Sequence, residues 1–156
     1  MKRTYMAVSG AVMALGVLTA CGGAEGEAAS QPEFPLSGLQ EYETPDQIAS
    51  DLTEGGFACE RFERQTGGMN AASSGNCWWS GGSGSEQEII LMIFNSDANK
   101  EEQADLLRDM GAVFGIEDWE YGFVEGGNWM VNCGNRDACD GVAGALGGRM
   151  EVDPLI

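Results

Sequence analysis

Thiol and carboxylate side chains are the groups in this sequence whose spacing best indicates their chemistry. The 156 residues include 5 cysteines, 25 acidic residues and 8 basic residues, and they include no histidine. A chain without histidine has no Ser-His-Asp or Cys-His machinery and no metal site that requires an imidazole. The Cys-x-x-Cys spacing of zinc sites and thiol oxidoreductases is also absent. We therefore expect neither a cofactor nor a metal ion.

The four cysteines downstream of the first are even in number, which is typical of exported proteins with disulfides. Four cysteines allow three pairings. A hairpin made of residues 57–62 and 77–79 has its midpoint at Gly68, and this midpoint places Cys59 opposite Cys77. The spacing therefore favours a Cys59–Cys77 disulfide.

The remaining pair is Cys133–Cys139. Cys133 ends an expected strand, and Cys139 lies near the start of the next expected helix. A short turn between them brings the two within bridging distance.

The acidic residues give the chain a net charge of −17. This charge argues against nucleic-acid binding, which requires clustered Lys and Arg. Residues 97–108 begin like a calcium loop, but Glu102 replaces the required glycine and Arg108 the final carboxylate. We expect the acidity to provide solubility, and attraction of a basic peptide or protein is the alternative.

The first 21 residues have the parts of a bacterial export signal. Lys2 and Arg3 are followed by an apolar stretch at 6–18, too short for a permanent membrane span, and then by LTAC at 18–21. This tetrapeptide resembles the lipobox of bacterial lipoproteins. The resemblance implies cleavage after residue 20 and attachment of a diacylglyceryl group to Cys21. An ordinary signal peptide with an accidental cysteine is the alternative.

Three segments follow from this interpretation: a signal peptide at 1–20, the lipidated Cys21 with a flexible tether to residue 43, and one globular domain at 44–156. The mature chain would carry 6 − 25 = −19 charges. Anionic lipid repels such a chain, so its two acyl chains must supply the attachment to the cell membrane. Residues 22–43 have the Gly, Ala, Glu, Ser and Pro content of a tether. The alternative is that the domain starts a few residues earlier and that Phe34, Leu36 and Leu39 pack on it.

Periodicity in the domain predicts helices and strands in the order αβββαββα. The first helix begins after Thr44, with Pro45 at its first position and Gln47 at a capping-box spacing. The expected strands are 57–62, 77–79, 88–94, 119–124 and 128–133, and the later helices span 97–111 and about 135–146. The fold class is therefore α+β, a small, mainly antiparallel sheet with about three helices, stapled by two disulfides.

Trp78 and Trp79 are neighbours in an expected strand, so their rings point to opposite faces of the sheet. Unless helices cover both faces there, one indole is partly exposed and can form a recognition surface.

The whole chain resembles the small lipoproteins of GC-rich Gram-positive bacteria. It is less similar to small secreted inhibitor domains, a likeness that only the Cys59–Cys77 arrangement supports. Neither resemblance implies an activity. We expect a membrane-anchored, extracytoplasmic, non-enzymatic binding module for a protein, peptide or cell-wall ligand. The alternative is a small cell-envelope hydrolase that uses carboxylates, which needs a cleft with two acids and one raised pKa.

Overall fold

The computed structural model describes residues 32–68, 70–81, 84–114 and 121–153, although no side chain is described at 111–121 or 153. The predicted signal peptide, Cys21, the tether up to residue 31 and Trp119 lie outside the described residues. In the described part of the chain, no helix has both the length and the apolar character needed to cross a membrane.

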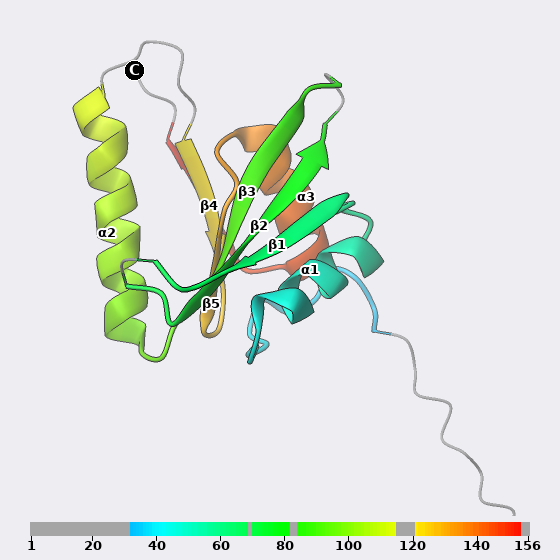
Figure 1. Ribbon diagram of the computed structural model, residues 1–156, viewed down its shortest axis with the longest axis horizontal. Coiled ribbons are helices and arrows are strands. Elements are labelled where there is room, and N and C mark those ends of the chain that lie inside the picture. Colours follow the sequence, from blue (N-terminus) through cyan, green and yellow to red (C-terminus); the bar gives the residue numbers. More distant parts are fainter. Residues whose placement is uncertain (1–31, 69, 82–83, 115–120, 154–156) are drawn as a thin grey trace, which may run out of the picture. The chain divides into compact units, whose positions relative to one another are not determined.

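Among the described residues, six antiparallel strands form one sheet, in the order β1-β2-β3-β5-β4-β6 (Figure 1). The strands are β1 (Arg61–Gln65), β2 (Ser73–Ser80), β3 (Glu86–Ile93), β4 (Tyr121–Glu125), β5 (Trp129–Asn132) and β6 (Arg149–Asp153). The helices are α1 (Pro45–Glu54), α2 (Asp97–Phe114) and α3 (Arg136–Leu146). The predicted α+β class, with an antiparallel sheet and three helices, is confirmed.

The helices divide between the two faces of the sheet (Figure 1). Side chains of α1 and α3, such as Leu52 and Val142, share one hydrophobic cluster with alternate residues of the sheet. Ala104 and Leu107 of α2 belong to a second cluster that includes Met92 and Met130. We call these the α1/α3 face and the α2 face.

Strand β3 carries the longest apolar run because both of its faces are covered. Ile89, Leu91 and Ile93 belong to the cluster on the α1/α3 face, and Ile90 and Met92 pack in the cluster on the α2 face. This agrees with its central position in the sheet, between β2 and β5.

The start of α1 agrees with the predicted capping box, and Asn135 caps α3. Gln47 Oε1 accepts a hydrogen bond from the Thr44 backbone N–H at 3.1 Å, and Asn135 Oδ1 accepts one from the Ala138 N–H at 2.9 Å. Helix α2 continues for three residues past Gly111, to Phe114. One glycine inside a helix costs only about 1 kcal/mol, which is too little to end it.

In the first hairpin, β1 starts later and β2 starts earlier than the sequence suggested. Strand β1 starts at Arg61 rather than at residue 57, and β2 already starts at Ser73, inside the expected 63–76 loop. In this register Cys77 pairs with Phe62, not with Cys59. The predicted midpoint of the hairpin at Gly68 was therefore wrong. Glu63 to Gln65 belong to β1 although these polar residues have no apolar pattern that would indicate a strand.

Strand β6 was not predicted, so the observed order is αβββαββαβ. It follows Gly147 and Gly148 and pairs with β4, with Arg149 opposite Glu125. Charged and apolar residues alternate in this strand, which is the pattern of a half-buried strand, but the segment is only five residues long and the predicted order ended at the preceding helix.

Residues 32–43, assigned to the tether by composition, pack on the domain, and the compact unit begins at Pro32. The Leu36 N–H donates to the Ala145 carbonyl at 3.0 Å. Tyr42 is buried, and its hydroxyl donates to Asp51 at 2.7 Å. Leu39, by contrast, is 80% exposed.

Candidate functional site

Both predicted disulfides are present. The Cα atoms of Cys59 and Cys77 lie 5.5 Å apart, and those of Cys133 and Cys139 lie 5.2 Å apart. Cys59 lies two residues before β1, so it bonds to Cys77 of β2 without being paired with it in the sheet. The pairing is therefore confirmed although the register used to derive it was wrong.

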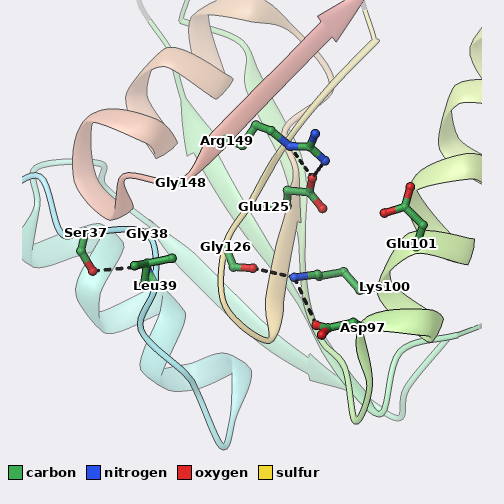
Figure 2. A pocket seen from close by; sticks show the side chains of 10 residues that line it. All are labelled: Ser37, Gly38, Leu39, Asp97, Lys100, Glu101, Glu125, Gly126, Gly148 and Arg149. Carbon is green, nitrogen blue, oxygen red and sulfur yellow. Dashed lines mark hydrogen bonds and ion pairs between the residues drawn. The ribbon is translucent and has the colours of Figure 1, made fainter.

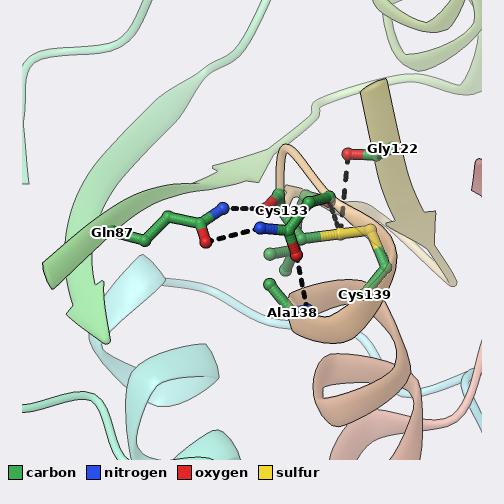
Figure 3. The surroundings of a disulfide bond; sticks show 7 residues. Gln87, Gly122, Cys133, Ala138 and Cys139 are labelled. Atoms are coloured by element: carbon green, nitrogen blue, oxygen red, sulfur yellow. Dashed lines mark hydrogen bonds between the residues drawn. A yellow bond between two sulfur atoms is a disulfide. The ribbon is translucent and has the colours of Figure 1, made fainter. Parts of the chain in front are cut away.

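The Cys133–Cys139 disulfide is enclosed by a polar network (Figure 3). The Gln87 side-chain amide donates to the Cys133 carbonyl at 2.8 Å and accepts from the Asn135 side chain at 2.7 Å. Both cysteines are fully buried. Because a thiolate cannot reach a buried disulfide without local unfolding, this pair joins β5 to α3 and is not placed for redox exchange.

Trp78 and Trp79 lie on opposite faces of β2, and both are partly exposed. Trp79 packs against the cluster of the α1/α3 face, and its ring stacks on Phe57 with centroids 5.0 Å apart. Trp78 points to the α2 face, where the guanidinium of Arg61 lies 3.8 Å from its ring centroid.

The surroundings of Trp78 are charged and open to solvent. Arg61 forms an ion pair with Glu86 at 3.5 Å, and these two side chains are 52% and 53% exposed. Asn76 donates to Glu88, the residue paired with Trp78 in the ladder. Trp78 does not belong to the cluster formed with α2. We call this set of five residues the Trp78 surface.

The two tryptophans are predicted to differ in their effect on stability. Trp78→Ala should lower the free energy of unfolding by about 1 kcal/mol, because it removes an exposed cation–π contact and little buried area. Trp79→Ala should cost about 2–4 kcal/mol, because it removes apolar burial and the stack on Phe57. Urea denaturation of both variants measures the difference. If both variants unfold in buffer, both rings are core and Trp78 is not a surface residue.

A charged cleft of about 590 Å³ lies where residues 37–39 meet α2 and the adjoining ends of β4 and β6 (Figure 2). Lys100 Nζ donates to the carbonyls of Gly126 and Gly127, at 2.7 and 2.5 Å. The Glu125 carboxylate is buried and paired with Arg149. This cleft has no signal in the sequence, because its charged residues come from α2, β4 and β6, which are far apart along the chain.

A second ion-pair network lies on the adjoining part of α2 and β6. Arg108 donates to both carboxylate oxygens of Glu151, at 2.7 and 3.0 Å, and to Asp105 at 2.7 Å. These hydrogen bonds from Arg108 lower the pKa of Glu151. A general acid needs a raised pKa, so the arginine pairing of Glu151 opposes that role.

The lowered pKa of Glu151 predicts a pH-dependent contribution to stability. A carboxyl group whose pKa is lower in the folded chain stabilises the fold above its unfolded pKa, and this contribution is lost as the pH falls through its folded pKa. Glu151→Gln should therefore cost about 1 kcal/mol at neutral pH, and the difference from the native chain should disappear in acid. Denaturation at several pH values between 7 and 3 measures this convergence.

Asp105→Asn is the matched control, because Asp105 contacts the same arginine but is 66% exposed. It should change stability less than Glu151→Gln at neutral pH. A Glu151→Gln difference that stays constant from neutral to acidic pH would contradict the ion-pair account.

Within the described residues, no group of three or more Cys, Asp or Glu side chains has a geometry that holds a metal ion. Comparisons with protein-family models, with curated proteins and with solved structures returned no match. Any assignment of function therefore depends on the residues of this chain alone.

Proposed function

We propose that this protein is an extracytoplasmic lipoprotein, anchored through Cys21, whose domain is a non-enzymatic recognition module. The observation that carries the proposal is the position of Trp78, which is partly exposed on the α2 face and lies outside the hydrophobic cluster formed with α2. Trp and Arg are the residues most often found to dominate the energy of protein interfaces. Trp78 and Arg61 provide both within one contact.

The charge around Trp78 favours a basic partner. Glu86 and Glu88 border the indole, and the chain as a whole carries a charge of −17. A protein or peptide segment with apolar and basic side chains matches this surface, because its charges would be attracted over a distance of about a Debye length. Binding should weaken as salt is added.

The alternative of a carboxylate hydrolase has less support from the charged cleft. Its buried acid, Glu125, is held by Arg149, and the neighbouring Glu151 is held by Arg108. Acid–base catalysis needs one carboxyl group that keeps its proton near neutral pH. Arg108 instead lowers the pKa of Glu151, which favours its charged form.

The anchor part of the proposal predicts the behaviour of Cys21→Ala. This variant should be released into the medium or should retain its signal, because no thiol is available to receive the diacylglyceryl group. The measurement is the intact mass of the mature protein, together with its distribution between membrane and medium. A mature native chain with an unmodified Cys21 would refute lipidation.

The recognition part is tested by capture from solubilised cell envelopes. The native chain, Trp78→Ala and Leu39→Ala are compared quantitatively. Leu39→Ala is the matched control, because it removes an exposed apolar side chain outside the Trp78 surface. A protein partner should be retained by the native chain and by Leu39→Ala and reduced at least about tenfold by Trp78→Ala. Equal capture by all three chains would contradict the proposal, and capture of wall glycan alone would change the partner class.

A further inference from the structure

A second hollow lies on the α2 face, between α2 and the middle of the sheet. It has a volume of about 200 Å³. Its apolar wall includes Ile90 and Met92 of β3 and Leu107 and Met110 of α2. This volume exceeds the 150 Å³ of an engineered apolar cavity that binds benzene, so it can hold a single small ring system.

Three uncharged polar side chains interrupt this apolar wall. They are Ser74 of β2, Asn132 of β5 and Gln103 of α2. None of the described lining residues carries a charge. A charged ligand would lose its hydration without gaining a counter-ion there, so the cavity favours a neutral molecule.

Gln103 is the residue that points to a ligand. It is only 2% exposed, and its Oε1 has no hydrogen-bond partner among the described residues. Leu107 follows it by one helical turn, so both side chains lie on the face of α2 that lines the cavity. An unpaired buried amide oxygen destabilises the fold unless a donor reaches it, and such groups are rare in native proteins.

We propose that this cavity binds a neutral ring compound of the size of phenol or indole, which donates one N–H or O–H hydrogen bond to Gln103. The ring fills the apolar part of the hollow between α2 and β3. The donor satisfies the only lining side-chain oxygen that is buried and unpaired among the described residues. The site is separate from the Trp78 surface and does not depend on the recognition function.

The same ring could belong to a free compound or to a tryptophan side chain of a peptide. The test uses the full chain carrying Cys21→Ala, so that no acyl group or detergent competes for the cavity. Three probes are titrated while backbone amide chemical shifts are recorded by NMR. The probes are indole, 1-methylindole, which lacks the N–H, and a short uncharged peptide with one tryptophan.

Indole should shift amides of α2 and β3 around the cavity, and 1-methylindole should bind about tenfold more weakly because it cannot donate to Gln103. In Gln103→Leu, which keeps the shape but removes the oxygen, this preference should disappear. Gln103→Leu should also unfold at a higher temperature than the parent chain, because an unpaired buried amide is removed. If the peptide causes the same shifts as indole, the site also accepts a tryptophan side chain, and if it causes none, the site takes the free compound.

Ile90→Phe, which fills the hollow from β3, should abolish the indole shifts while Leu39→Ala retains them. The proposal is overturned if indole at millimolar concentration causes no shifts at the cavity. It is also overturned if the native chain binds indole and 1-methylindole equally. This second comparison needs no cavity-filling variant, so it remains decisive even if Ile90→Phe does not fold.

Discussion

Trp129→Ala is expected to lower the free energy of unfolding by about 3–5 kcal/mol, which is the usual cost of removing a fully buried indole. Trp129 has no exposed surface and belongs to the cluster of the α1/α3 face. Its ring meets Tyr42 edge-on, with centroids 6.2 Å apart. The substitution therefore leaves a cavity in the core and removes the ring contact that Tyr42 of segment 32–43 makes with the indole. Urea denaturation, with the midpoint and slope fitted together, measures the loss.

Trp129→Phe is the control for this prediction. Trp129 Nε1 has no hydrogen-bond partner among the described residues, so phenylalanine removes volume without breaking a polar contact. It should cost clearly less than alanine. If Trp129→Ala cost less than about 1 kcal/mol, the assignment of this residue to the core would be wrong.

Loss of the Cys59–Cys77 disulfide is expected to have the second largest effect. The bond closes a separation of 18 residues, and the chain-entropy estimate for such a loop is about 3 kcal/mol. Replacing both cysteines with alanine should lower the free energy of unfolding by that amount. The β1–β2 hairpin should become the least protected part of the sheet in hydrogen exchange.

The Cys133–Cys139 double-alanine variant provides the comparison. Its loop spans 6 residues, so the entropic part of its loss should be smaller, about 2 kcal/mol. Non-reduced peptide mapping of the native chain identifies both bonds directly. A peptide linking Cys59 to Cys133 or Cys139 would contradict the pairing and the strand order together.

Local sequence patterns predicted the elements that carry their own signals. The apolar run in β3 and the capping box of Thr44 and Gln47 each depend on neighbouring residues, and the structure agrees with them. Strand β6 also carries a local signal, because charged and apolar residues alternate from Arg149 to Asp153, but five residues are too few to identify a strand without its partner. That partner is β4, and Glu125 and Arg108 pair with Arg149 and Glu151.

The candidate site was predictable to a similar extent. Strand alternation indicated that Trp78 and Trp79 face opposite ways, and the register agrees. Phe57 determines which of the two indoles packs in the core, because it stacks on Trp79. The sequence placed Phe57 in a strand, but it lies in the segment after α1. The charged cleft and the cavity beside Gln103 depend on how α2 packs, which no local pattern contains.

Site-specific photo-crosslinking in intact cells tests the recognition proposal most directly. A photoreactive phenylalanine analogue replaces Ser80, an exposed residue two positions after Trp78 on the same face of β2, in one strain and Glu54, an exposed residue of α1, in another. Trp78 itself is retained in both strains. We expect irradiation to yield one discrete adduct with an envelope protein from position 80 and none from position 54. No adduct at position 80, or the same adducts from both positions, would contradict the proposal that this surface binds a partner.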